Sequence, residues 1–262
     1  MGSSADRLIV ATCQFPVDAD VTRNLRYVLR QIREAASRGA EVVHFPECAL
    51  SGYAGSDLAD LEAMDWGRLD HAMRQVMRCA AESSVWVVVS PGNHLTVFEI
   101  NGVRCGTAIC HDYRYPELYR EYKRRDVQLM FHSYHAAHAS ARTITAMRAH
   151  VGPDVQALNP GGTYPGITMP ATMTAAAAAS HMWISCPSSS ARESCWAAFV
   201  IRADGITIGR LPRNRTGILI TTVDTAADLY DSTSAWRGRA LAGVLHSGTP
   251  VQDERSDRRT EL

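Results

Sequence analysis

Lysine is nearly absent from this sequence of 262 residues: Lys123 is the single lysine among 27 lysine and arginine residues. Acidic residues also number 27, so the formal net charge is zero. A chain with no excess of positive charge does not favour binding to nucleic acid or to an anionic membrane surface. The sequence also lacks any run near the roughly 18 apolar residues that a membrane span needs. We therefore expect neither a nucleic-acid partner nor a membrane partner.

The sequence contains no Cys-x-x-Cys motif, although it has seven cysteines. This absence argues against a zinc ribbon or a thioredoxin-like redox pair. The number of cysteines is odd, and the polar opening, residues 1–6, lacks the charged-then-apolar pattern of a signal peptide. We therefore expect reduced thiols and a cytoplasmic location.

Three histidines, His132, His135 and His138, follow one another at intervals of three residues. Imidazole is a common zinc ligand, but no cysteine or carboxylate lies near them in the sequence to complete a metal site. We therefore predict no metal. Because His135 directly follows an apolar segment that predicts a strand, we expect its side chain to line a pocket.

Short apolar segments alternate with amphipathic segments along most of the chain, and no linker divides them. The spacing of the apolar side chains predicts helices within 21–38, 69–83, 116–125, 139–150 and 168–180. Apolar runs predict strands at 7–15, 41–45, 85–90, 103–110, 126–131, 182–186 and 217–223. Asn101-Gly102 and Asp204-Gly205 predict hairpin turns, 152–166 predicts a loop and 230–244 a polar arm. This alternation is typical of an α/β fold.

Cys110 stands where an apolar strand gives way to polar residues and then to Pro116, which favours the first turn of a helix. A cysteine on such a turn has free backbone N–H groups beside it that can face a developing oxyanion. The positive end of the following helix also favours the thiolate form. The alternative is a half-buried structural cysteine, because most free cysteines act as small apolar side chains.

A second motif lies upstream, where a short strand runs into Phe45-Pro46-Glu47. Together with the Cys-x-Asp-x-Arg-x-Pro-Glu sequence that begins at Cys110, this order of motifs resembles the nitrilase superfamily of carbon–nitrogen hydrolases. The resemblance implies a four-layer α-β-β-α sandwich in a single domain over residues 7–248, and a homodimer. The charged segment 249–262 would follow as a disordered tail.

The resemblance also implies a reaction, the hydrolysis of a non-peptide carbon–nitrogen bond in a small molecule. Cys110 would attack an amide or an N-carbamoyl amine, with a nitrile as the less favoured substrate, and form an acyl-enzyme. Glu47 would take the thiol proton and later activate water. The family needs no metal or cofactor, so we predict none.

One departure concerns the lysine that this family uses, which lies between the glutamate and the cysteine in sequence. This chain has no lysine there, and the predicted strand 85–90 passes directly into Pro91-Gly92-Asn93-His94. We therefore expect the hairpin and loop that carry the lysine to be missing. Lys123 lies beyond Cys110 on a charged helix and is a poor substitute.

Removal of one oxyanion donor lowers an enzyme's rate by about 10²–10³, so we expect weak or absent catalysis unless another cation takes the lysine's place. The nearest candidates in sequence are His111, Arg114 and His135.

Three other interpretations stay open. The chain could be a pseudoenzyme that binds a small molecule or a protein partner; it could lack a segment of a longer parent enzyme, which leaves a sheet edge unpaired; or it could be an unrelated hydrolase that pairs Cys110 with one of its ten histidines.

Overall fold

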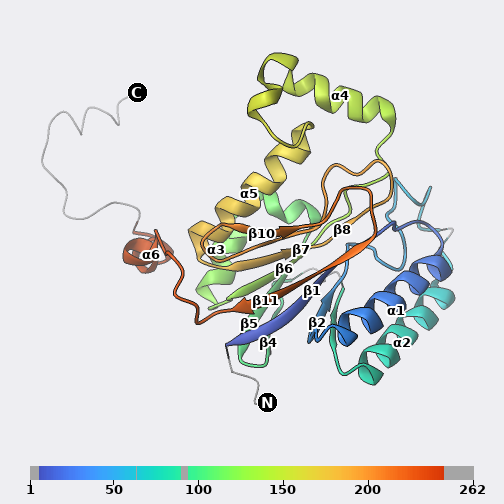
Figure 1. Ribbon diagram of the computed structural model, residues 1–262, viewed down its shortest axis with the longest axis horizontal. Coiled ribbons are helices and arrows are strands. Elements are labelled where there is room, and N and C mark those ends of the chain that lie inside the picture. Colours follow the sequence, from blue (N-terminus) through green and yellow to red (C-terminus); the bar gives the residue numbers. More distant parts are fainter. Residues whose placement is uncertain (1–5, 63, 90–93, 245–262) are drawn as a thin grey trace, which may run out of the picture.

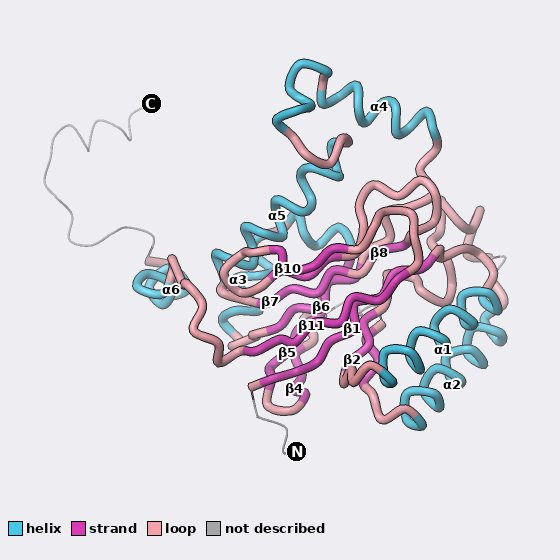
Figure 2. Tube along the Cα trace, viewed as in Figure 1, coloured by secondary structure: helices cyan, strands magenta, loops and turns pink. Residues whose placement is uncertain are grey.

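The computed structural model describes residues 6–62, 64–89 and 94–244, which form two β-sheets packed face to face with helices on both outer surfaces (Figure 1). The helices flank the central strands in the same way in the trace of Figure 2. This is a four-layer α-β-β-α sandwich, so the predicted fold class is confirmed. Within the described ranges, no helix is both long and apolar enough to cross a membrane.

The first sheet is built around β1 (Arg7–Phe15). This strand pairs antiparallel with β11 (Gly217–Asp224) and parallel with β2 (Val42–His44). Beyond β2 lies β3 (Trp86–Val88), and the two-residue β8 (Ser188–Ser189) pairs with the end of β1. The parallel strands β1, β2 and β3 therefore end at the same edge of this sheet.

The second sheet has the strand order β10-β9-β7-β6-β5-β4. In chain order its strands are β4 (Val97–Ile100), β5 (Val103–Ile109), β6 (Leu129–Ser133), β7 (Trp183–Cys186), β9 (Phe199–Ile201) and β10 (Thr207–Arg210). Asn101 and Gly102 join β4 to β5, and both have positive φ angles, of 49° and 83°. A tight two-residue hairpin turn needs this conformation, so the predicted hairpin is confirmed.

The helices are α1 (Val21–Ser37), α2 (Trp66–Glu82), α3 (Pro116–Arg124), α4 (Ala141–Val151), α5 (Tyr164–Ser180) and α6 (Ser234–Leu241). Figure 1 shows α1 and α2 on one outer face, α3 and α5 on the other, and α4 projecting away from the sheets. The side chain of Asp20 accepts hydrogen bonds from the N–H groups of Thr22 and Arg23 and so begins α1. Asp65 begins α2 in the same way.

Three apolar clusters hold the layers together. The one between the sheets includes Leu8 and Val10 of β1 and Leu129 and Phe131 of β6. Alternate side chains of β1 point the other way and pack under α1 and α2. A third cluster lies between the second sheet and α5. Each sheet is therefore apolar on both faces, as the sandwich requires.

Several predicted boundaries are wrong. The stretch 152–166 is not all loop: Pro153–Leu158 forms a 3-10 helix and α5 begins at Tyr164, where Thr163 accepts a hydrogen bond from the Gly166 N–H. The second predicted helix begins at Trp66 rather than at 69, because Asp65 caps it. The predicted polar arm contains α6. The segment 249–262 lies outside the described residues.

Candidate active site

The two sheets bring three chain segments together at the carboxyl ends of their parallel strands. Glu47 follows β2, Cys110 follows β5 and His135 follows β6. Glu47 is buried, with 6% of its surface exposed, and its carboxylate and the Cys110 thiol lie close enough to shift each other's pKa. The backbone of His135 lies close enough to both side chains to lower their pKa values. The two predicted site residues are therefore close together, although they follow strands of different sheets.

Cys110 sits on a sharp turn between β5 and a short 3-10 helix, η1 (Cys110–Arg114). Its φ angle is 40°, a left-handed conformation that is uncommon for a residue with a side chain. Asp112 stabilises the turn, because its carboxylate accepts a hydrogen bond of 2.9 Å from the N–H of Ile109. Such strained backbone is concentrated at functional sites, where the surrounding structure holds it in place.

His132 holds the turn from the other side. Its Nε2 lies 3.1 Å from the carbonyl oxygen of Cys110, and its Nδ1 hydrogen-bonds with the hydroxyl of Tyr119. A carbonyl can only accept, so Nε2 carries the proton and Nδ1 accepts from Tyr119. Burial lowers the pKa of His132 to about 3. The neutral ring, stacked on Tyr134 at 4.3 Å, therefore orients the backbone of Cys110 without adding charge.

The environment of the pair disfavours negative charge. Burial raises the pKa of Glu47, while the neighbouring Cys110 thiol and then His135 lower it. Burial, followed by the negative charge of Glu47, raises the pKa of Cys110 to about 12. Between these two pKa values the pair holds one proton and one negative charge. Chemically, such a pair can transfer the thiol proton to the carboxylate when the sulfur attacks an electrophile.

A loop that follows β2 brings an unexpected carboxylate to this site. The Asp57 side chain is fully buried, and its Oδ2 lies 2.9 Å from Nε2 of His135. Its Oδ1 contacts Nδ1 of His138, and Oδ2 also accepts from the Tyr53 N–H at 2.8 Å. The Tyr53 ring stacks on His135 with centroids 5.1 Å apart. Sequence reasoning missed Asp57, because nothing in its loop shows which strand end it contacts.

Gly52 makes this loop possible. Its φ angle is 77°, and a Cβ there would lie 2.5 Å from the carbonyl oxygen of Asp18. Any larger residue would therefore clash with the backbone that precedes α1. The Ser51-Gly52-Tyr53 sequence is the one signal that could have indicated a close approach of this loop to the rest of the fold.

The three histidines of the metal hypothesis do not share one site. His132 binds Tyr119 and the Cys110 carbonyl, whereas His135 and His138 both contact Asp57. Among the residues that the structure describes, no group of three or more His, Cys, Asp or Glu side chains is placed to hold a metal ion. The expectation that His135 lines a pocket stays a prediction.

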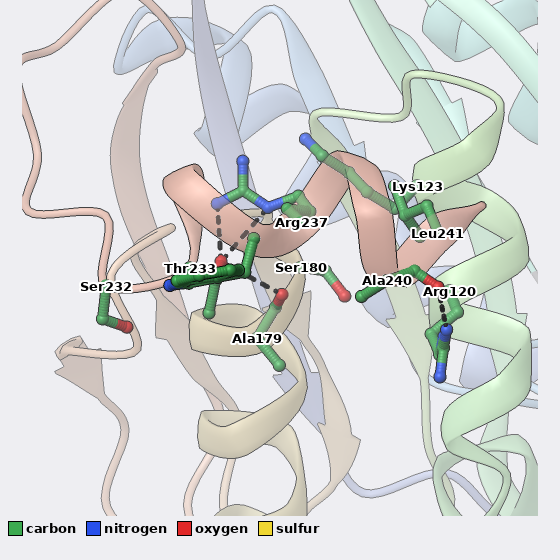
Figure 3. A pocket seen from close by; sticks show the side chains of 10 residues that line it. Arg120, Lys123, Ala179, Ser180, Ser232, Thr233, Arg237, Ala240 and Leu241 are labelled. Carbon is green, nitrogen blue, oxygen red and sulfur yellow. Dashed lines mark hydrogen bonds between the residues drawn. The ribbon is translucent and has the colours of Figure 1, made fainter. Parts of the chain in front are cut away.

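The other cation candidates are placed elsewhere. His111 and Arg114 are exposed, and the guanidinium of Arg114 lies over the ring of Tyr113. Lys123 lines a cavity of about 300 Å³ beneath α6, and Figure 3 shows it there with Arg237. Its Nζ donates to the carbonyl oxygen of His181 at 3.4 Å, and burial together with Arg237 lowers its pKa. Lys123 thus belongs to a different region from Glu47.

Solved structures with the same fold include forms of an amidase from Nesterenkonia sp. AN1. One is a mutant with the acetamide moiety of fluoroacetamide added covalently at its active site cysteine; it has a TM-score of 0.66 and 16% identity, and the match covers 94% of this chain and all of that one. Another is a double mutant in complex with acrylamide, with a TM-score of 0.65, 15% identity and coverage of 100% and 99%. At these identities the likeness shows the fold.

Curated relatives match over shorter stretches. Hydrolase Rv0480c of Mycobacterium tuberculosis is 25% identical over 170 residues, which cover 46% of this chain and 59% of that protein. A glutamine-dependent NAD(+) synthetase of Xylella fastidiosa is 35% identical over 118 residues, which cover 43% of this chain and 20% of the synthetase. This chain therefore spans less than two thirds of either relative.

A family model gives a broader match. The model described as carbon-nitrogen hydrolase matches residues 9–90 and 82–229, so it covers most of the chain in two pieces that overlap at 82–90. That match includes both the segment that carries Glu47 and the one that carries Cys110. It agrees with the order of motifs in the sequence and with the four-layer fold. The chain belongs to the carbon-nitrogen hydrolase family.

Proposed function

We propose that this protein hydrolyses the carbon–nitrogen bond of a small amide or N-carbamoyl amine, with Cys110 as nucleophile and Glu47 as general base. The observation that carries the proposal is the placement of a buried carboxylate beside a thiol on a strained turn, close enough for each group to shift the pKa of the other. The amidase neighbours, bound to acetamide and acrylamide groups, make short aliphatic amides the first substrates to test.

The reaction proceeds in two halves. Glu47 accepts the thiol proton while Cys110 Sγ attacks the carbonyl carbon, and the resulting oxyanion faces the backbone N–H of His111. Glu47 then gives its proton to the leaving nitrogen as the carbon–nitrogen bond breaks, which leaves a thioester on Cys110 and releases the amine. In the second half Glu47 takes a proton from water, the hydroxide attacks the thioester, and the proton returns to Sγ as the acid leaves.

Ammonia release from acetamide, propionamide, acrylamide and simple N-carbamoyl amines tests this proposal. We expect turnover by the unmodified protein and a loss on the order of 10³ or more in Cys110→Ala and in Glu47→Gln, since each variant removes a member of the reacting pair. Glu117→Gln, at an exposed position on α3, is the matched control and should keep full activity. Equal rates for Glu47→Gln and Glu117→Gln would contradict the proposal.

A pseudoenzyme is the second candidate. It is favoured by the high pKa of Cys110, about 12, and by the absence of a lysine between Glu47 and Cys110 in the sequence. This candidate predicts that short amides bind without being hydrolysed, so calorimetry would detect binding while no ammonia forms.

The homodimer also stays a prediction. Size exclusion with light scattering tests it, and the mass of a monomer, about 28.7 kDa, would contradict it.

A further inference from the structure

A buried chain of hydrogen bonds joins the two sheets behind the candidate active site. Thr12 of β1 and His44 of β2 are register partners in the first sheet. The hydroxyl of Ser185, on β7 of the second sheet, lies 2.7 Å from Oγ1 of Thr12 and 2.9 Å from Nδ1 of His44. On the other side of the ring, Nε2 of His44 lies 3.0 Å from the hydroxyl of Ser133 on β6. All four side chains are buried.

The donors and acceptors of this chain can all be assigned. The Ser133 hydroxyl donates to the carbonyl oxygen of Phe45 at 3.2 Å, because a carbonyl can only accept. The Ser133 oxygen therefore accepts from His44, whose Nε2 carries a proton. Burial lowers the pKa of His44 well below its usual value, so the ring is neutral and Nδ1 accepts from Ser185. Ser185 in turn accepts from Thr12, so the chain runs in one direction from Thr12 to Phe45.

Ser133 lies between the two segments that carry the proposed nucleophile and base. In the second sheet it is the register partner of the residue that precedes Cys110. Its hydroxyl contacts the carbonyl of Phe45, two residues before Glu47. The next residue of the chain, Tyr134, accepts a hydrogen bond of 3.2 Å from the backbone N–H of Glu47. The end of β6 therefore contacts the Glu47 segment through two hydrogen bonds and lies beside the Cys110 segment in the sheet.

His44 is a polar residue in an apolar run, since Val42, Val43 and Phe45 surround it in the sequence. A buried ring nitrogen costs free energy unless it is hydrogen-bonded, and a satisfied hydrogen bond adds little net stability over an apolar side chain. Hydrogen bonds do add direction and a fixed distance, which apolar contacts lack. A fully satisfied buried network also favours one arrangement of the core. The gain from His44 is therefore geometric precision between the sheets.

We propose that His44 and Ser133 are positioning residues that set the separation of Glu47 from Cys110 by joining the ends of β2 and β6. The inference rests on the proposed function, in which the Glu47 carboxylate accepts the proton of the Cys110 thiol. His44 and Ser133 act through the backbone of the segment that leads to Glu47, and their own protons stay within the chain of hydrogen bonds.

The test compares two substitutions of His44 that differ in reach. The amide nitrogen of glutamine is as many bonds from Cβ as Nε2 of histidine, so His44→Gln keeps a donor for Ser133. The asparagine side chain is one carbon shorter and matches Nδ1 only. Ser133→Ala removes the same link from its other end. We expect His44→Asn and Ser133→Ala to behave alike, and His44→Gln to behave like the unmodified protein.

The readout is the pH dependence of Cys110 alkylation by iodoacetamide, followed by peptide mass spectrometry, because it needs no substrate. Glu47→Gln is combined with each substitution in a double-mutant cycle. In the His44→Asn and Ser133→Ala backgrounds, the shift that Glu47→Gln causes should fall to about half or less, because the interaction of the carboxylate with the thiol weakens with distance. In the His44→Gln background the shift should keep its full size.

The matched control is Thr12→Val, which removes a buried hydroxyl of the same chain but leaves the link between His44 and Ser133, and it should keep the full shift. Thermal unfolding of every variant separates this effect from a loss of stability. If short amides are substrates, His44→Asn should also lower kcat by about tenfold to a hundredfold with little change in KM, since a misplaced base slows only the chemical step.

Three outcomes would overturn the proposal: a full Glu47→Gln shift in folded His44→Asn, an equal loss of the shift in His44→Gln, or no shift in the unmodified protein. If His44→Asn does not fold, Ser133→Ala decides by the same criterion. A failure of the proposed function looks different, because the alkylation pattern would hold while no amide releases ammonia. Conversely, amide turnover with a shift indifferent to His44 and Ser133 would retain the function and remove their positioning role.

Discussion

His132 and His135 lie three residues apart at the end of β6, but the fold gives them opposite surroundings. His132 faces Tyr119 and the carbonyl of Cys110, and burial lowers its pKa to about 3. His135 faces the buried carboxylate of Asp57 at 2.9 Å. One histidine is held neutral and fixes the shape of the turn at Cys110; the other lies beside an anion. The difference shows that the fold, and not the regular spacing of the histidines, decides which polar groups each ring meets.

The largest effect is expected from removal of His132. His132→Leu leaves the carbonyl of Cys110 and the hydroxyl of Tyr119 without their partner in a buried region. We expect a loss of about 2–4 kcal/mol in the free energy of unfolding, together with slower alkylation of Cys110, because the strained turn relaxes. His71→Leu, on the exposed face of α2, should change stability by less than about 0.5 kcal/mol. Denaturant unfolding measures the free energy of unfolding of both variants. An equal loss in the two variants would contradict the role of His132.

The pH dependence of stability distinguishes His132 from Asp57. In the unfolded chain His132 takes up a proton near pH 6.5, whereas in the fold it does so near pH 3. The unfolded state therefore binds more protons between these values, and stability falls as the pH falls, by up to about 1.4 kcal/mol per pH unit. His44, whose pKa burial also lowers, adds to this slope.

Asp57 affects the stability of the fold in a lower pH range. Its pKa in the fold is below the usual 3.8, so the stability it contributes is present above that value and is lost as the pH falls through the lowered pKa. Asp57→Asn should thus leave the slope between pH 4 and 6.5 unchanged, while His132→Leu should flatten it. Urea unfolding at several pH values gives the slope of the free energy of unfolding against pH for both variants. An equal slope in the two variants would contradict this prediction.

A smaller effect on the free energy of unfolding, of the opposite sign, is expected when Glu47 is replaced. Its pKa is raised by burial and one of its oxygens has no hydrogen-bond partner among the described residues, so the carboxylate destabilises the fold at neutral pH. Glu47→Gln should raise the free energy of unfolding by about 1 kcal/mol, against no change in Glu117→Gln. A lower melting temperature in Glu47→Gln would show that the charge is fully compensated.

The smallest change is expected at His138, which contacts Asp57 from the outside and is 30% exposed. Its side chain is partly open to water, so His138→Gln should slow the alkylation of Cys110 by no more than about twofold near neutral pH. A much larger slowing would contradict this expectation.

The sequence predicts those parts of the site that lie at strand ends. Glu47 and Cys110 each follow an apolar run, and parallel strands that end together bring such residues together. Asp57 could not be predicted in this way, because its loop has no periodic pattern and its contacts are made to a distant segment. His132 and His135 have the same sequence context, and only the three-dimensional fold shows that one meets a phenol and the other a carboxylate.

The fold boundaries that were wrong have a related cause. The predicted loop over 152–166 contains glycine and proline, yet Pro165 lies in the first turn of α5, where a missing N–H costs nothing. Pro170 lies inside the same helix, and packing against the second sheet keeps the helix intact despite this proline. Burial of Met169 and Met173 stabilises the helix here and outweighs the helix-breaking tendency of proline.

The central claim is that Glu47 and Cys110 share one proton in a working pair. The most direct measurement compares the pH dependence of Cys110 alkylation in the unmodified protein and in Glu47→Gln, by mass spectrometry across all seven cysteines. We expect Glu47→Gln to shift the alkylation profile of Cys110 to lower pH, because the negative charge of Glu47 raises the pKa of the thiol. A profile that Glu47→Gln leaves unchanged would contradict the claim, because the two side chains would then not interact.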